Sequence, residues 1–460
     1  MKQKSNNFLN KFLLLTSLVA FFATGLFAVN KDDVYFSNEK DKSVLLKPIN
    51  GLDDESYDKF ILGRSFFTIP WVESPSATTA RDGLGPLFNA NTCISCHPKN
   101  SRGTLFNEKG NISRSLVARL SIPSNNSIQH QEMLKKDGFI KEPIYGAQVS
   151  INAVHGLKFE AKPKIEFEEK KVIFPDGEVV ILLKPNYSLT EKNYGELAKN
   201  TAISFRIAPS LNGLGLLEQI SNDDILANVD EFDKNGDGIS GKANFVYSSL
   251  TKKLELGKYT WKASSATIYE QIAAAANNDM GLTTNLFINE NCTENQIECN
   301  KKASSNKSID ITDERLEAID FYIKNIKTYK SKETKVFKEG LEIFENISCV
   351  KCHKNNFNTK LGIKISPYTD LLLHDMGAGL SDGRSEFKAS KNEWRTAPLW
   401  GLALHEKITN KKPRLLHDGR ARNFEEAILW HGGEALNSRN AYMKLEKKQR
   451  EKLLKFLGEI

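Results

Sequence analysis

The chain carries Cys93-Ile94-Ser95-Cys96-His97 and, 256 residues further on, Cys349-Val350-Lys351-Cys352-His353. Both stretches fit Cys-x-x-Cys-His, the pattern through which c-type haem is attached to a protein. The two thiols can form thioether bonds with the vinyl groups of the porphyrin, and the imidazole that follows is placed to bind the iron on its proximal side. The sequence therefore predicts two covalently bound haems c, attached at Cys93, Cys96, Cys349 and Cys352, with proximal ligands His97 and His353.

Two other kinds of site use the same Cys-x-x-Cys spacing, namely a zinc knuckle and a redox-active dithiol. A structural zinc site needs four ligands, and a His directly after the second Cys is not the usual spacing of its partner. The chain has two haem motifs and no other Cys-x-x-Cys. We therefore favour a dihaem protein over both alternatives.

The first 28 residues have the composition of a secretory signal. A basic start with Lys2, Lys4 and Lys11 leads into an apolar stretch at 12–27, and a signal peptidase can cut after Ala28. An uncleaved membrane anchor is the alternative, because the apolar stretch approaches the length of a membrane span. In either case the body of the protein lies outside the cytoplasm, and we expect a periplasmic protein with a signal peptide at 1–28.

The remaining cysteines agree with an exported protein. Four of the six belong to the haem motifs, which leaves Cys292 and Cys299 in a polar segment with the composition of a loop. In an oxidising compartment we expect these two to form a disulfide that closes a small loop. No thiol is then left over for a catalytic cysteine.

The apolar pattern predicts a mainly α fold with a β insertion. Residues 54–102 indicate helix and loop, and residues 313–329 carry an apolar side at helical spacing. Alternating apolar and polar residues at 164–183, around the turn Pro175-Asp176-Gly177, predict β-hairpins. A short helix at 336–344 is expected to lead into the second haem motif.

A polar, Lys-rich stretch at 327–333 lies between the two haem motifs and predicts a domain boundary. We expect two cytochrome c-like haem domains. The first spans 29–326 and is enlarged by the hairpin insertion and by a calcium-like loop, and the second spans 334–460.

The calcium-like loop lies at 230–241, in the sequence DEFDKNGDGISG. Oxygen donors at alternate positions, a glycine turn and a backbone carbonyl reproduce the first half of an EF-hand loop and predict the calcium ligands Asp233, Asn235, Asp237 and Ile239. The second half departs from that pattern, because Asn244 stands at position twelve in place of a bidentate Glu. A solvated turn is the alternative, since turns also select Asp, Asn and Gly.

Several further stretches resemble one family, the dihaem oxidoreductases described as thiol oxidoreductases or dihaem peroxidases. They are DGLGPLFN at 82–89, EWRTAPLWG at 393–401, LHDGRAR at 416–422 and EAILWHGGEA at 426–435. The family is related to bacterial dihaem cytochrome c peroxidases and to the dihaem enzyme that matures tryptophan tryptophylquinone. The likeness covers nearly the whole mature chain.

This resemblance implies a division of labour between the two haems. The N-terminal haem, held by His97, would reduce hydrogen peroxide or a related oxidant, and the C-terminal haem, held by His353, would pass electrons to it. The implied electron donor is a small redox protein or a quinol-linked donor. The net charge of +7 is too small to indicate a nucleic-acid partner.

The chain departs from the peroxidase pattern at the sixth ligand of the C-terminal haem. The peroxidases carry a ligating Met directly before His-Asp-Gly, where this chain has Leu416. The candidates that remain are Met376, His417 and His374, and either histidine can instead be structural.

The sequence assigns no catalytic acid-base group, although His130, His155 and Glu218 are available. A dihaem electron carrier without a substrate of its own is the alternative function.

Overall fold

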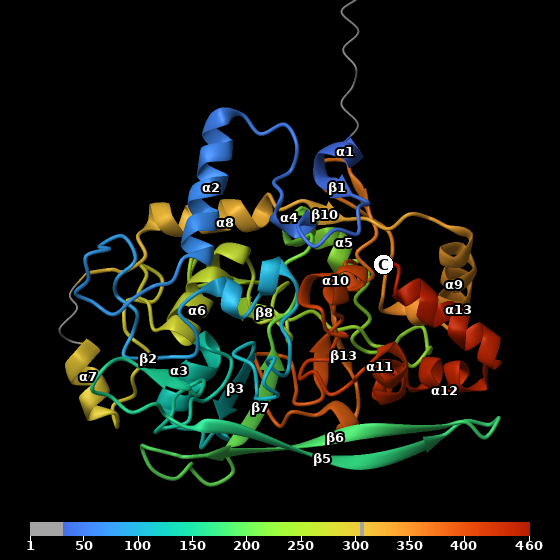
Figure 1. The fold of residues 1–460 in the computed structure, drawn as a ribbon. Helices are drawn as coiled ribbons and strands as arrows, with labels where there is room; N and C mark the ends of the chain where they lie inside the picture. Colours follow the sequence, from blue (N-terminus) through green and yellow to red (C-terminus); the bar gives the residue numbers. More distant parts are fainter. Residues whose placement is uncertain (1–30, 304–307) are drawn as a thin grey trace, which may run out of the picture.

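The protein is described by a computed structural model that covers residues 31–303 and 308–460 (Figure 1). The expected signal peptide at 1–28 lies outside the described residues. Within the described part of the chain, no helix is long and apolar enough to cross a membrane.

Helices and strands occur in mixed runs along the chain. The helices are α1 (Lys31–Tyr35), α2 (Asp54–Thr68), α3 (Ile128–Lys136), α4 (Leu214–Glu218), α5 (Asn222–Leu226), α6 (Ile268–Met280), α7 (Ile297–Ala303), α8 (Asp313–Lys324), α9 (Lys335–Asn346), α10 (His405–Thr409), α11 (Phe424–Trp430), α12 (Leu436–Lys444) and α13 (Lys447–Leu457). The strands are β1 (Phe36–Ser37), β2 (Leu87–Phe88), β3 (Leu116–Ser121), β4 (Asn152–Ala153), β5 (Lys162–Ile173), β6 (Val179–Thr190), β7 (Ala202–Ile207), β8 (Phe245–Tyr247), β9 (Leu254–Leu256), β10 (Thr328–Tyr329), β11 (Phe357–Asn358), β12 (Lys364–Ile365), β13 (Leu373–Asp375) and β14 (Glu393–Arg395).

The prediction of a mainly α fold is wrong. The structure is 32% helix and 19% strand, which is the balance of an ordinary mixed protein. Its strands form separate two-stranded pairs, β1–β10, β2–β4, β3–β7, β5–β6, β8–β9, β11–β12 and β13–β14. Most of these strands have two or three residues, so their sequences carry too little alternation to be recognised.

The β5–β6 hairpin is longer than predicted and does more than enlarge an N-terminal domain. Its two twelve-residue strands pair from Lys162↔Thr190 to Ile173↔Val179, and Figure 1 shows them along the bottom of the molecule. At the turn, Arg450 of α13 donates to Asp176 at 2.8 Å and to Glu178 at 2.7 Å. The hairpin is thereby attached to the C-terminal helices.

Two main apolar cores hold the molecule together. One joins α2, α6 and α8, and the first haem motif packs against it through Cys93 and Ile94. The larger core combines β3, β6 and β7 with α9, α11, α12 and α13. This larger core crosses the stretch at 327–333, so the two expected domains at 29–326 and 334–460 share buried apolar residues. That division remains a prediction.

The helices next to the haem motifs confirm most of the helical pattern. The helix expected at 336–344 is α9, and it crosses α13 at Gly340, where a Cβ atom would lie 2.3 Å from the Cβ of Phe456. A larger residue at Gly340 would push the two helices apart. The helix expected at 313–329 is α8, which ends at Lys324, and β10 then pairs with β1 in parallel.

Candidate functional site

The first haem motif forms a tight turn whose histidine is held by a distant carbonyl. The Thr92 hydroxyl accepts a hydrogen bond from the amide of Ser95 at 3.2 Å and so caps the turn that carries Cys93. The Nδ1 atom of His97 donates to the carbonyl of Pro209 at 2.8 Å. Burial lowers the pKa of His97 to about 4, so the imidazole is neutral and keeps a lone pair on Nε2.

The second haem motif repeats this arrangement. His353 donates from Nδ1 to the carbonyl of Tyr368 at 2.8 Å, and burial lowers its pKa to about 4. Histidines that bind a metal through one nitrogen commonly donate the other to a carbonyl, which fixes the tautomer and the orientation of the ring. Both motifs therefore present Nε2 as a prepared ligand.

The four motif cysteines fit haem attachment better than the two alternatives. They are not paired with one another, and burial raises the pKa of Cys93 and of Cys349 to about 12. A redox-active dithiol needs the opposite shift, towards a thiolate. At the second motif, Cys352, Asp370 and His374 place one ligand atom each within 4.8 Å of the others, one fewer than a structural zinc site takes.

A cavity of about 430 Å³ lies beside the first motif, with Cys93, Cys96 and His97 in its wall. This volume is in the range of small-molecule and cofactor sites. The other walls are mixed, with Phe67 and Trp261 among the aromatic residues and Arg102 and Asp279 among the charged ones. The size of the cavity and the position of His97 fit a haem at this place.

The family follows from a comparison with known proteins. Residues 30–460 match the family model described as "Di-haem oxidoreductase, putative peroxidase". The chain belongs to this family. Its members are dihaem proteins, so two haem cofactors are expected, and this dihaem oxidoreductase has one Cys-x-x-Cys-His motif for each. No curated protein matches the chain.

The dihaem oxidoreductase holds a half-buried carboxyl group in the cavity wall. Asp279, near the end of α6, accepts a hydrogen bond from Gln148 Nε2 at 2.6 Å. Burial raises the pKa of Asp279, although the bond from Gln148 and the charge of Arg119 oppose the shift. Sequence reasoning missed this residue, because nothing in the local pattern of α6 separates it from the neighbouring polar residues.

The residues considered earlier as acid-base candidates lie elsewhere in the described structure. His155 is exposed. His130, in α3, accepts a hydrogen bond from the amide of Asn125. Glu218 forms an ion pair with Lys324 at 2.7 Å. None of the three is among the residues that line the cavity. Asp279 is therefore the better candidate for proton transfer in the cavity whose wall includes His97.

One short segment connects the two motif regions. Arg395, Ala397 and Pro398 line the cavity beside the first motif. Between them, the carbonyl of Thr396 accepts a hydrogen bond from the Thr369 hydroxyl at 2.5 Å. Thr369 follows Tyr368, whose carbonyl holds His353. The segment 395–398 thus has the cavity on one side and the second motif on the other.

The three candidates for the sixth ligand have different surroundings. Both nitrogens of His374 are occupied, Nδ1 by Glu434 at 2.7 Å and Nε2 by Asp370 at 2.8 Å. Although burial opposes the charge, Asp370 raises the pKa of His374 well above its ordinary value, so the ring is an imidazolium. An imidazolium with two carboxylate partners has no lone pair for iron.

The backbone of His417 lies against the other motif region. Its ring stacks on Trp394 with centroids 3.8 Å apart, and its backbone carbonyl accepts from the amide of Ile207 at 2.7 Å. Ile207 is in the wall of the cavity beside His97. Met376 is half buried against the larger core.

The predicted calcium ligands are engaged in hydrogen bonds of their own loop. Asp233 accepts from the amide of Gly238, Asn235 from the amide of Asp237, and Asp237 from the amide of Ile239. Asp237 also pairs with Lys351 of the second haem motif at 3.0 Å. These bonds are those of a stable turn, and calcium binding at this loop remains a prediction.

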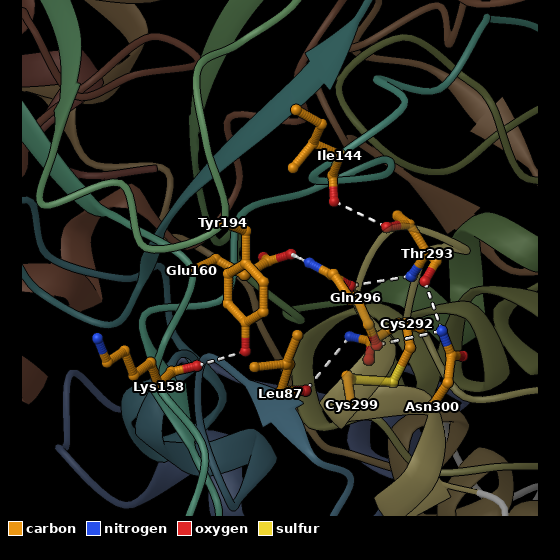
Figure 2. The surroundings of a disulfide bond; sticks show 11 residues. Leu87, Ile144, Lys158, Glu160, Tyr194, Cys292, Thr293, Gln296, Cys299 and Asn300 are labelled. Carbon is orange, nitrogen blue, oxygen red and sulfur yellow. Dashed lines mark hydrogen bonds between the residues drawn. A yellow bond between two sulfur atoms is a disulfide. The ribbon is translucent and has the colours of Figure 1, made fainter.

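A disulfide joins Cys292 to Cys299 in the structure (Figure 2). The loop that it closes is bonded to the segments around it. Thr293 donates from its hydroxyl to the carbonyl of Ile144 at 2.8 Å, and Gln296 donates to Glu160. Asn291, next to the disulfide, donates to the carbonyl of Leu87 at 3.3 Å. The disulfide loop therefore supports β2, which leads into the first haem motif.

Proposed function

We propose that this dihaem oxidoreductase reduces hydrogen peroxide, or a related oxidant, at the haem held by His97, with electrons that arrive through the haem held by His353. The cavity beside the first motif carries this proposal, because its wall contains both a prepared iron ligand and an acid whose pKa is raised. Peroxide reduction requires both at one place.

The chemistry divides between cofactor and protein. Bound haem supplies redox-active iron, and two haems store the two electrons that conversion of peroxide to two waters consumes. The protein supplies the proton path. Asp279, whose pKa burial raises, can hold a proton and give it to the departing oxygen, while Gln148 fixes the position of its carboxyl group.

The proposal extends to attachment, location and partners. We infer that both haems are bound covalently through Cys93, Cys96, Cys349 and Cys352, because all four thiols are unpaired and each pair is followed by a prepared histidine. Covalent attachment of this kind and the leader at 1–28 together suit the periplasm. The electron donor is then a small periplasmic redox protein or a quinol-linked donor.

The test replaces each proximal histidine separately. His97→Gly and His353→Gly keep all four thiols, so the mass of the protein reports how many haems remain attached. We expect both variants to lose peroxide turnover with a reducing donor, and peroxide binding to survive only in His353→Gly. If His97→Gly still binds and reduces peroxide, the roles of the two haems are reversed. If the wild-type protein with two haems does not react with peroxide, it is an electron carrier.

A further inference from the structure

Three histidines share one arrangement of their ring nitrogens. His97 and His353 donate from Nδ1 to a backbone carbonyl, and His431 does the same to the carbonyl of Ala427 at 2.6 Å. A carbonyl can only accept, so Nδ1 of His431 carries the hydrogen and Nε2 keeps the lone pair. His431 is thus prepared for metal binding in the same way as the two proximal histidines.

The position of His431 is next to the second haem motif. It directly follows α11 and begins the segment 431–435. Three residues on, Glu434 binds Nδ1 of His374, and that atom lies 3.7 Å from Sγ of Cys352. Trp430, directly before His431, belongs to the same apolar core that Cys349 of the second motif packs against. These contacts place the segment that begins at His431 beside the second haem motif.

Two neighbouring residues fix the backbone of His431. Glu434 accepts hydrogen bonds from the amide of Asp375 at 2.9 Å and from the amide of Ser240 at 3.0 Å, which ties the segment to β13 and to the calcium-like loop. Gly433 has φ +52°, and a Cβ atom there would lie 2.1 Å from the carbonyl oxygen of Asp375. The close approach that holds His431 in place therefore requires glycine.

Two of the other candidates are less suitable. His374 has both nitrogens occupied by carboxylates, and the ring of His417 is stacked on Trp394, with its backbone bonded to the wall of the cavity beside His97. Leu416 has no ligand atom. We propose that His431 is the sixth ligand of the iron held by His353, so that the C-terminal haem has two axial histidines. The segment Gly432-Gly433-Glu434 positions this ligand.

Two axial histidines have consequences for the C-terminal haem. An iron with both axial positions filled is closed to an oxidant and needs little reorganisation when it accepts an electron. A methionine ligand raises the reduction potential of a haem, so a histidine in its place gives a lower potential. The inference requires a haem at the second motif, and it does not require peroxide to be the substrate.

The test counts low-spin haems in the oxidised protein by electron paramagnetic resonance, with mass spectrometry to show that two haems are attached. His431→Ala should convert one haem per chain from low spin to high spin, and added imidazole should restore it. The control Met376→Leu should leave the count unchanged. His431→Met should keep the low-spin haem and raise its potential.

Two results would overturn the proposal. One is an unchanged low-spin count in His431→Ala with both haems attached, and the other is a low-spin haem that disappears in Met376→Leu. If His431→Ala fails to fold, His431→Met decides, because an unchanged potential excludes His431 as the ligand. Failure of the wild-type protein to react with peroxide would refute the proposed function and leave this spin count unaffected.

Discussion

Replacement of Gly433 by alanine tests the close contact that positions His431. The new Cβ would lie 2.1 Å from the carbonyl oxygen of Asp375 and 2.7 Å from the amide nitrogen of Gly377, so the backbone of one of the two segments would have to move. A left-handed backbone with φ +52° costs a residue with a Cβ about 1–2 kcal/mol. Forcing an extra carbon into a packed site adds about 1–3 kcal/mol.

The chain offers a matched control for the cost of the left-handed backbone. Gly110 also has a positive φ, +78°, but a Cβ atom there meets nothing within 4 Å. Gly110→Ala should therefore lose only the strain of about 1–2 kcal/mol. Gly433→Ala should lose about 2–5 kcal/mol, seen as a lower midpoint in urea unfolding at equal slope. Its low-spin haem signal should also weaken, because His431 moves away.

The result that refutes this reasoning is specific. If Gly433→Ala unfolds at the same urea concentration as Gly110→Ala and keeps its low-spin signal, the contact with Asp375 does not position His431. A stability loss with an intact signal would show that the contact stabilises the fold and leaves the ligand in place.

Three further predictions follow from individual residues. Asp279→Asn should lower peroxide turnover by about 10²-fold or more with both haems still attached. The control is Asp320→Asn, which should leave turnover unchanged, although burial also raises the pKa of Asp320. Equal effects of the two substitutions would exclude Asp279 as the proton donor. Burial raises the pKa of Glu160 to about 8, so protonated Glu160 stabilises the fold below its unfolded pKa and this contribution is lost as the pH rises towards 8. Glu160→Gln should reduce the fall in the free energy of unfolding between about pH 5 and pH 8 by up to about 1.4 kcal/mol per pH unit. If urea unfolding at a series of pH values shows the same dependence on pH in the variant and the wild type, this prediction is wrong. Calcium should raise the melting temperature of the wild type and of Lys351→Ala but not that of Asp237→Ala; if calcium has no effect on any of the three, the loop at 230–241 is only a turn.

Features that depend on neighbouring residues could be predicted from the sequence. The two haem motifs, the hairpin around Pro175-Asp176-Gly177 and the helix that became α9 are each encoded in one continuous stretch of sequence. In each case the chemistry or periodicity of a continuous stretch is enough to decide the structure.

Features that depend on distant contacts could not be predicted in this way. The carbonyl that holds His97 belongs to Pro209, 112 residues away, and Asp279 reaches the cavity from another helix. The fold class was wrong because short strands such as β1 and β2 are stabilised by partners far along the chain. His431 lies in the stretch at 426–435, but its proposed role as an iron ligand follows only from its bond to Ala427 and from the contacts of Glu434.

The most direct measurement is the absorption spectrum of the purified dihaem protein, oxidised and partly reduced, before and after one equivalent of hydrogen peroxide. The proposed function predicts one high-spin haem that reacts with peroxide, at the iron of His97, and one low-spin haem that supplies an electron. Two low-spin haems and no reaction with peroxide, in a protein whose mass shows both haems attached, would contradict it.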